Sequence, residues 1–123
     1  MARILVIEDN PASLHLMQYV LKAFQHQPLT ATNGASGIEI AQRERPNLIL
    51  CDINMPGTSG YEVLARLKND PGTADLPVVA VTALAMVGDR DRLLKAGFDG
   101  YLAKPVDPEA FVKDVEVFLS KAA

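Results

Sequence analysis

The feature that most constrains the fold is an apolar run, residues 48–51, that ends on Asp52. The run follows Pro46, is apolar at every position and is too short for a free-standing helix. These properties are typical of a strand that is buried on both faces of a parallel sheet. Open α/β sheets bind ligands at the carboxyl ends of their strands, so an acid in that position points to a functional site.

Three further apolar runs also end in polar residues. The runs cover residues 3–7, 77–81 and 100–103. The polar residues that follow them are, in chain order, Glu8 with Asp9, Thr82 and Lys104. Because the carboxyl ends of parallel strands meet at one edge of a sheet, we expect these side chains to lie close to Asp52.

Helical patterns alternate with the strands. The first helix is predicted to begin after an Asn10 cap and to present an apolar stripe toward the core. That stripe consists of Leu14, Met17, Leu21 and Phe24. Ser59 and Glu62 form a capping-box pattern at the start of the third helix. The fourth helix is expected to bury Leu93 and Leu94.

A shorter and weaker strand is expected at residues 29–32, which makes five strands that alternate with five helices. This order predicts a three-layer, doubly wound α/β sandwich around one parallel sheet, with right-handed crossovers. With 123 residues, the chain has the size of one domain.

Composition argues against several classes of protein. A net charge of −3 gives no electrostatic reason to bind nucleic acid or an anionic membrane. The single cysteine, Cys51, excludes a disulfide scaffold and a Cys-x-x-Cys zinc site, and its apolar surroundings favour a small buried side chain. The sequence has no signal-peptide pattern and no apolar run of the ~18 residues that cross a bilayer, which predicts a cytoplasmic protein.

The acids at the predicted sheet edge have two interpretations. Glu8, Asp9 and Asp52 would repel one another at neutral pH, and Mg²⁺, a cation that prefers hard oxygen ligands and bound water, would relieve the repulsion. Alternatively, Glu8 and Asp9 are only an acidic strand end in front of a helix, where negative charge is favourable. With a metal, Lys104 and Thr82 around it, Asp52 would be the nucleophile of a phosphoryl-transfer site.

Four motifs together resemble the receiver domain of two-component response regulators. They are Glu8-Asp9; Asp52 with Met55-Pro56-Gly57 and Ser59-Gly60; Val81-Thr82-Ala83; and Lys104-Pro105. The resemblance covers the whole chain, residues 1–123, and implies a flavodoxin-like fold with the strand order 2-1-3-4-5. It also implies a cis peptide bond between Lys104 and Pro105. One departure is mild, since Glu8 stands where the family more commonly has aspartate.

The resemblance implies a role for each site residue. Asp52 would accept a phosphoryl group from the phosphohistidine of a histidine kinase, and Lys104 would bind that group. Thr82 and Tyr101 fill the two switch positions of the family. The implied Mg²⁺ ligands are Asp9, Asp52, the Asn54 backbone carbonyl and, through bound water, Glu8.

The chain is expected to work as a receiver without an output domain, not as an enzyme, and to act as a monomer that docks on other proteins. Residues 83–89 also resemble the stand-alone DivK type of receiver. Expected partners are a sensor histidine kinase or a histidine phosphotransfer protein, and a downstream protein target. Two alternatives stay open. One is a phosphorelay shuttle that passes the group from Asp52 to a second histidine protein, and the other is a receiver cut from a hybrid kinase.

Three apolar residues are candidates for partner docking. Leu16 lies off the apolar stripe of the first helix, and Val106 lies beside the same predicted site. We hypothesise that both form an apolar rim for the kinase or phosphotransfer protein. Met86 lies in the apolar run 84–87, which is either core or a surface for the downstream target.

Two other classes fit the fold but not the motifs. A haloacid-dehalogenase-type phosphatase also uses a strand-end aspartate with Mg²⁺, but it needs a second acid two residues later, where this chain has Asn54. Its nucleophile also usually follows the first strand, whereas Asp52 follows the third. A flavodoxin-like cofactor-binding protein would share the fold, but the turn at residues 8–11 is acidic, has no glycine and would repel a phosphate.

Overall fold

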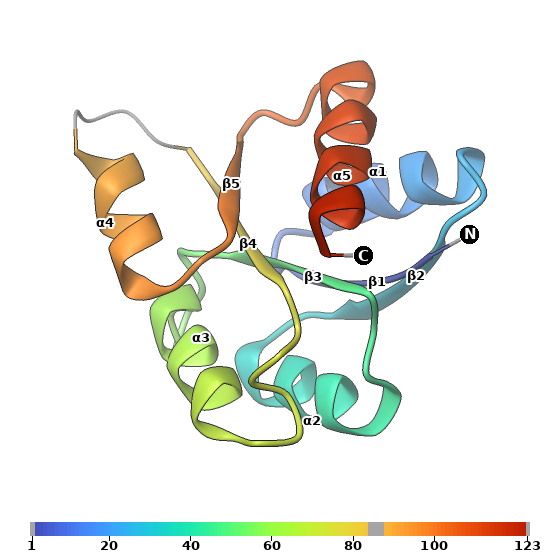
Figure 1. The fold of residues 1–123 in the computed structure, drawn as a ribbon. Helices are drawn as coiled ribbons and strands as arrows, with labels where there is room; N and C mark the ends of the chain where they lie inside the picture. Colours follow the sequence, from blue (N-terminus) through green and yellow to red (C-terminus); the bar gives the residue numbers. More distant parts are fainter. Residues whose placement is uncertain (1, 84–87, 123) are drawn as a thin grey trace.

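The computed structural model describes residues 2–83 and 88–122, in which five strands alternate with five helices (Figure 1). The strands are β1 (Arg3–Ile7), β2 (Gln27–Ala31), β3 (Leu48–Asp52), β4 (Val78–Thr82) and β5 (Gly100–Ala103). The helices are α1 (Pro11–Ala23), α2 (Gly34–Glu44), α3 (Gly60–Asn69), α4 (Asp89–Ala96) and α5 (Pro108–Ala122). The strands are parallel in the order β2-β1-β3-β4-β5, which confirms the predicted doubly wound sheet.

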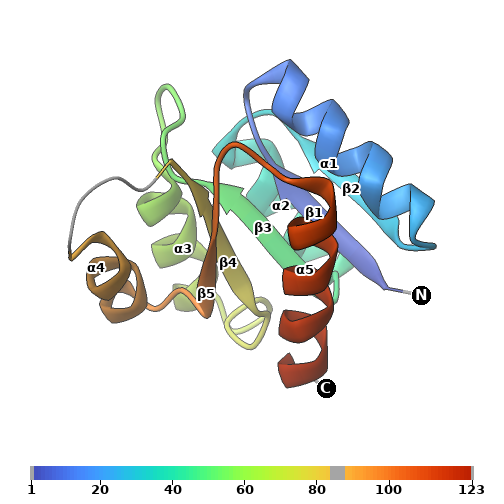
Figure 2. The ribbon, with the colours of Figure 1, turned by 90° about the horizontal axis from the view of Figure 1, so that it is seen from above.

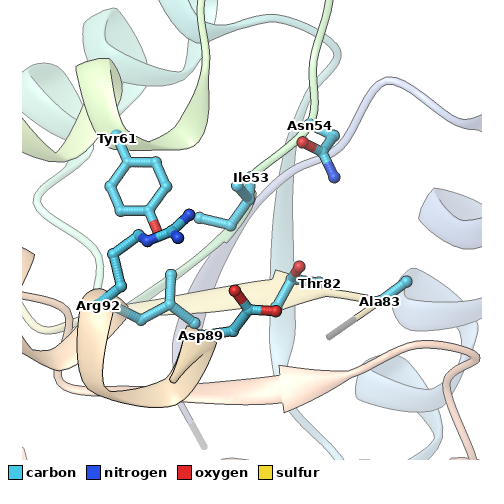
Figure 3. A pocket seen from close by; sticks show the side chains of 8 residues that line it. Ile53, Asn54, Tyr61, Thr82, Ala83, Asp89 and Arg92 are labelled. Carbon is cyan, nitrogen blue, oxygen red and sulfur yellow. The ribbon is translucent and has the colours of Figure 1, made fainter. Parts of the chain in front are cut away.

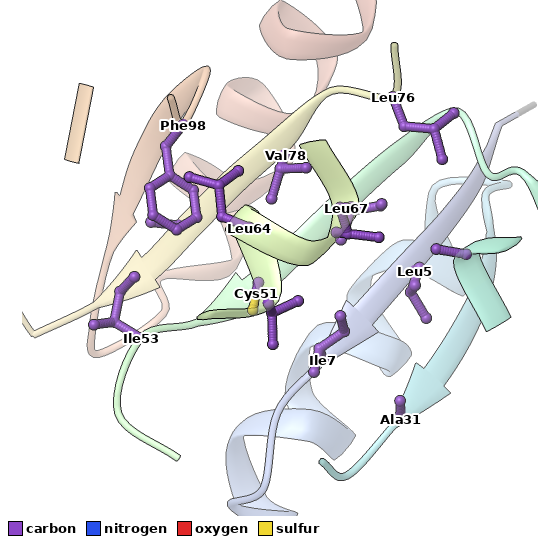
Figure 4. Packing of buried hydrophobic residues seen from close by; sticks show 14 of the residues in the cluster. Leu5, Ile7, Ala31, Cys51, Ile53, Leu64, Leu67, Leu76, Val78 and Phe98 are labelled. Carbon is purple, nitrogen blue, oxygen red and sulfur yellow. The ribbon is translucent and has the colours of Figure 1, made fainter. Parts of the chain in front are cut away.

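Helices cover both faces of the sheet, with α1 and α5 on one side and α2 and α3 on the other (Figures 1 and 2). α4 adds Leu93 to the α2–α3 side. Because side chains alternate along a strand, β1 sends Leu5 and Ile7 to the α2–α3 side (Figure 4). It sends Ile4 and Val6 to the α1–α5 side. Burial on both sides explains why the central strands are apolar at nearly every position.

The same alternation decides on which side of the sheet the strand-end side chains lie. On β3, Asp52 follows two residues after Leu50 and therefore faces the same side of the sheet, the α1–α5 side. On β4, Thr82 follows two residues after Ala80 and therefore faces the α2–α3 side. The register pairs Asp52 with Val81, so Thr82 lies one position further along. The acid and the hydroxyl therefore share an edge of the sheet but belong to different sides of it.

Side-chain caps fix where the chain leaves this edge. The Asn10 side-chain oxygen accepts a hydrogen bond from the Ser13 N–H at 3.0 Å, and α1 begins directly after it. Ser59 Oγ accepts from the Glu62 N–H at 3.3 Å at the start of α3, which confirms the predicted cap. Each cap of this kind contributes about 1 kcal/mol to stability.

Two residues that were predicted to be buried are exposed. Phe24 is 53% exposed because α1 ends at Ala23 and Phe24 is its C-cap, with φ −103° and ψ 25°. Val20 takes the buried position on the inner side of α1 instead. Leu94 is 42% exposed, since α4 has only 8 residues and Leu93 already occupies its inner side.

The environment of Cys51, the single cysteine of the chain, determines its reactivity. Cys51 is fully buried, as predicted, and burial, followed by the charges of Asp52 and Glu8, raises the pKa of its thiol to about 12. Such a thiol stays protonated and inert at neutral pH.

The bond between Lys104 and Pro105 is cis, as the resemblance implied. Within residues 2–83 and 88–122, no helix combines the length and hydropathy that crossing a bilayer requires.

Candidate functional site

The structure brings the predicted site residues together at the carboxyl edge of the sheet. Each lies at or just after the end of a strand, and they are Glu8, Asp9, Asp52, Thr82 and Lys104. Glu8 is fully buried, and Asp52 and Thr82 are 4% and 5% exposed. Asp9 and Lys104 are half-buried, so solvent reaches the cluster at these two side chains.

The Lys104 ammonium joins two of the acids. Its Nζ lies 2.7 Å from Oε1 of Glu8 and 3.5 Å from Oδ1 of Asp52. The backbone of Lys104 is also fixed, because its N–H donates to the Thr82 carbonyl oxygen at 2.9 Å and holds the end of β5 against β4. Burial lowers the pKa of Lys104, but the two carboxylates outweigh that effect and raise the pKa overall. Lys104 is therefore charged at neutral pH.

The backbone N–H and the Oε2 atom of Glu8 each form a hydrogen bond, whereas Oε1 has Lys104 as its close partner. Its N–H donates to the Ala31 carbonyl oxygen at 2.9 Å, and its Oε2 accepts from the Asn10 N–H at 3.1 Å. Oε1 is buried and, among the described residues, has no hydrogen bond of good geometry, although Lys104 Nζ lies close to it. This oxygen retains capacity for a further partner, such as a bound water.

The surroundings of Asp52 raise its pKa to about 7. The largest cause is burial, followed by the interactions with the Glu8 carboxylate. Lys104 and the Asn54 N–H, which donates to Asp52 Oδ1 at 3.3 Å, act in the opposite direction. Neighbouring carboxylates are both charged at low cost only when they share a cation. The cluster is therefore arranged to favour a positive charge in addition to Lys104.

The same acids form a set of candidate metal ligands. One carboxylate oxygen from each of Glu8, Asp9 and Asp52 lies within 4.8 Å of the other two. Asn54, whose backbone carbonyl was predicted as a ligand, follows two residues after Asp52 in an exposed position. Hard oxygen ligands, few in number and open to water, suit Mg²⁺. The donor chemistry and the underused Glu8 oxygen both fit this ion.

A pocket of about 230 Å³ lies beside Thr82, between α3 and α4 (Figure 3). Its lining includes Ile53, Asn54, Tyr61 and Arg92. Tyr101, the second predicted switch residue, is half-buried on β5 and packs against the α2–α3 core. Thr82 therefore borders open space on the side of the sheet that α3 and α4 cover.

The structure describes two of the three docking candidates. Leu16 and Val106 are half-buried and pack against the same core cluster on the α1–α5 side of the sheet. Their shared location agrees with one apolar rim, and their role in docking stays a prediction. Met86 lies outside the described residues.

Gly60, which belongs to one of the motifs of the family resemblance, shapes the site in a way that the motif did not specify. Gly60 begins α3, and its N–H donates to the Ile53 carbonyl oxygen at 2.9 Å. A Cβ at this position would lie 2.6 Å from the Asp52 carbonyl oxygen and 2.8 Å from Ile53 Cα. The absence of a side chain lets α3 start directly against the strand end that carries Asp52. In the sequence, Gly60 is marked by the Ser59-Gly60 motif and by its place after the Ser59 cap, and neither identifies a close contact with β3.

The motifs predicted a receiver domain, and the observed strand order agrees with that class of protein. The acids, the hydroxyl and the ammonium at the carboxyl edge of the sheet agree with it as well. Residues 4–116 match the response regulator receiver domain family, and the chain belongs to that family. The family assignment made from the motifs is confirmed. The chain is thus a receiver domain of two-component signalling.

Relatives align with nearly the whole chain. The polar-differentiation response regulator DivK of Brucella anthropi is 34% identical over 119 residues, which cover 97% of each chain. Protein PilH of Pseudomonas aeruginosa is 36% identical over 120 residues, which cover 98% of this chain and 99% of PilH. The receiver domain of sensor histidine kinase PA1611 from Pseudomonas aeruginosa has a TM-score of 0.87 and 28% identity, with 97% and 98% of the two chains covered. That structure holds a magnesium ion coordinated in the active site cleft.

Proposed function

We propose that Asp52 is the phosphoacceptor of this receiver and takes its phosphoryl group from the phosphohistidine of a sensor histidine kinase or phosphotransfer protein. The observation that carries the proposal is the position of Asp52, buried at a strand end with Lys104 Nζ 3.5 Å away and two further acids beside it. The test is incubation of the wild-type chain with acetyl phosphate and Mg²⁺. We expect a mass gain of one phosphoryl group, which a chelator prevents. No gain with Mg²⁺ present would refute the proposal.

In the transfer step, an Asp52 carboxylate oxygen forms a bond to phosphorus. The bond from phosphorus to the donor imidazole nitrogen breaks, and its electron pair stays on that nitrogen. Lys104, which is paired with Glu8 and Asp52 before the reaction, carries a charge that can turn toward the phosphoryl oxygens. The Thr82 hydroxyl at the neighbouring strand end donates to one of these oxygens. Groups already in place thus stabilise the charge of the transferred group.

Asp9, Asp52 and the backbone carbonyl of Asn54 would hold Mg²⁺ directly, and Glu8 would act through a bound water. The mutual proximity of the three carboxylates and the underused Oε1 of Glu8 support this assignment. When bound, Mg²⁺ offsets negative charge on the phosphoryl oxygens. The magnesium ion in the cleft of the PA1611 receiver lends further support.

Phosphorylation would change the surface of the receiver through Thr82 and Tyr101. It places up to about −2 charge on Asp52, toward which the Thr82 hydroxyl moves, and Tyr101 turns inward into the space that this movement opens. A shift from 1:99 to 99:1 between two states requires about 5.5 kcal/mol of differential stabilisation. A charge-assisted hydrogen bond supplies only about 1.5–3 kcal/mol. Phosphorylation therefore shifts the switch in part, and binding of a downstream target completes it.

Thr82→Ala should still be phosphorylated but should lose most of the phosphorylation-dependent gain in affinity for the downstream target. The methyl group of alanine cannot donate to the phosphoryl oxygens, so the charge on Asp52 no longer moves the switch. The measurement is a titration with a target protein captured on the phosphorylated wild-type chain. Thr82→Ser keeps the hydroxyl and should keep the gain. If Thr82→Ala retained the full gain, the coupling would run by another route.

Leu16→Ala should slow phosphoryl transfer from a protein donor and leave labelling by acetyl phosphate unchanged. The side chain lies near the Asp9 end of α1, where a kinase or phosphotransfer bundle must approach, while a small donor needs no such surface. Transfer from the cognate phosphorylated donor is followed by gel autoradiography. Phe24→Ala removes an exposed side chain at the opposite end of α1 and should transfer normally. Equal slowing of Leu16→Ala with both donors would indicate a folding defect and remove the docking role.

A further inference from the structure

The loop between β3 and α3, residues 53–59, begins directly after the strand end that carries the candidate site. Ile53 and Met55 are buried in the core on the α2–α3 side, and the Ile53 N–H donates to the Val81 carbonyl oxygen at 3.2 Å. Asn54 lies between these two buried residues and is exposed. The loop is therefore fixed where it leaves the strand, and the position of its outer part depends on its other contacts.

The first residue of α2, Gly34, lies against the outer part of this loop. Gly34 is buried and follows the Asn33 cap. A Cβ at Gly34 would lie 2.9 Å from Cγ2 and 3.1 Å from Cβ of Thr58, and 2.9 Å from Cγ2 of Val63 on α3. Since α2 and α3 lie side by side on one face of the sheet, the start of α2 reaches the loop that leads into α3 (Figures 1 and 2). The absence of a side chain lets α2 pack this closely on Thr58.

The turn that connects Thr58 with Asn54 has little conformational freedom. The ring of Pro56 restricts its own φ. The Thr58 N–H donates to the Pro56 carbonyl oxygen at 3.0 Å, and Gly57 between them has a φ of +83°. A push on Thr58 would therefore move the turn as a unit and reach Asn54, because no flexible segment lies between them to absorb it.

We propose that Gly34 positions this loop for Mg²⁺ binding, because its contact with Thr58 holds the Asn54 backbone carbonyl beside the acids of the site. The atoms nearest to the Cβ position of Gly34 belong to Thr58 and Val63, so Gly34 is a positioning residue that acts through the loop. Mg²⁺ requires a nearly ideal octahedral geometry, and a small displacement of one ligand therefore lowers the affinity. This inference rests on the proposed Mg²⁺ ligands, and its test separates the two.

The test is a titration of the ¹⁵N-labelled, unphosphorylated chain with MgCl₂ at constant ionic strength. Gly34→Ala should raise the dissociation constant for Mg²⁺ by at least about threefold, which is less than the roughly 10–100-fold typical of residues that hydrogen-bond to a ligand. The amide signal of Asn54 should differ from that of the wild type already without Mg²⁺, because the new Cβ displaces the loop. Thermal unfolding in chelator records the loss of stability separately.

Gly100→Ala is the matched control for a loss of stability. Gly100 begins β5, at the opposite edge of the sheet from Asp52, and a Cβ there would meet the ring of Phe118 on α5. This variant should also unfold more easily, but its affinity for Mg²⁺ should equal that of the wild type. A loss of affinity that merely follows a loss of stability would appear in both variants.

Second substitutions identify the contact that carries the effect. Thr58→Ser removes Cγ2, the loop atom closest to the new Cβ, and should restore most of the Mg²⁺ affinity when it is combined with Gly34→Ala. Val63→Ala removes the equally close methyl group of α3 and should not restore it. Thr58→Ser alone should bind Mg²⁺ as the wild type does, since serine keeps the hydroxyl group and the Cβ.

A variant on the loop side tests the same contact if Gly34→Ala does not fold. Thr58→Gly removes the atoms that rest on α2 and should also weaken Mg²⁺ binding. Because Thr58 is only half-buried and lies in a loop, this variant should keep the fold.

Wild-type affinity for Mg²⁺ in folded Gly34→Ala would overturn the proposal, as it would in Thr58→Gly if folded Gly34→Ala cannot be obtained. An equal loss of affinity in Gly100→Ala, or equal restoration by Val63→Ala, would remove the role of the loop contact. If the wild-type chain itself bound no Mg²⁺, the proposed metal ligands would be wrong and the positioning role would fail with them.

Discussion

Asp52→Asn should accept no phosphoryl group from acetyl phosphate or from a histidine kinase. Asparagine has nearly the shape of aspartate, but its amide lacks the negatively charged oxygen that attacks phosphorus. Its side-chain oxygen can still accept from the Asn54 N–H, as Asp52 Oδ1 does at 3.3 Å, so the loop should keep its conformation. The measurement is the intact mass after incubation with acetyl phosphate and Mg²⁺. In the wild type, treatment with hydroxylamine should then remove the added group, because it is an acyl phosphate.

Two controls test whether the loss of labelling is specific to Asp52. Asp91→Asn removes an exposed aspartate on α4 and should be labelled like the wild type. Thermal unfolding of Asp52→Asn in chelator should occur at the same temperature as for the wild type or higher, because one of three neighbouring carboxylates no longer contributes to their repulsion. Labelling of Asp52→Asn to the wild-type extent would refute the assignment of the phosphoacceptor.

Gly60→Ala should lower the free energy of unfolding by about 2–4 kcal/mol. The new Cβ would lie 2.6 Å from the Asp52 carbonyl oxygen and 2.8 Å from Ile53 Cα. Both atoms belong to the backbone, so no side-chain rotation relieves the clash and the start of α3 must move away from β3. This cost exceeds the roughly 1 kcal/mol by which alanine is favoured over glycine in a helix. Thermal unfolding should show a Tm lower by roughly 10 °C.

The displaced strand end should also affect the chemistry. Because the clash falls on the Asp52 backbone, labelling of Gly60→Ala by acetyl phosphate should be slower even at temperatures where the variant is folded. Gly72→Ala is the matched control, since its Cβ would meet only the Asp70 side chain, with the nearest atom 3.4 Å away. It should unfold within about 1 kcal/mol of the wild type. If the two variants were equally stable, the close approach of α3 to β3 would be wrong.

The central strands and the membership of the site were predictable because both depend on short-range patterns. Uninterrupted apolar runs indicate strands that are buried on two faces, and the polar residue after each run then lies at the ligand-binding edge. Glu8, Asp52 and Lys104 meet there as expected, at 2.7 and 3.5 Å from the lysine Nζ. These patterns did not predict the order of the strands in the sheet, which came from the family resemblance. Pairing between strands that are far apart in the sequence leaves no local pattern.

Other features could not be read from local patterns. The burial of Phe24 and Leu94 was wrong because helical periodicity does not reveal where α1 stops or how little of a short α4 faces the core. The contact of Gly60 with the Asp52 backbone is a distance between two elements.

The placement of Asp52 and Thr82 on different sides of the sheet separates input from output under the proposed function. The donor would approach over α1 and Val106, on the side where Asp52 packs, while Thr82 would act on Tyr101 on the α2–α3 side and the downstream target would bind over α4, β5 and α5. Substitutions on α1 could then change which donor is accepted without altering the side chains around Thr82 and Tyr101. Under this proposal the two steps meet at the carboxyl edge of the sheet, where Asp52 and Thr82 lie on neighbouring strands.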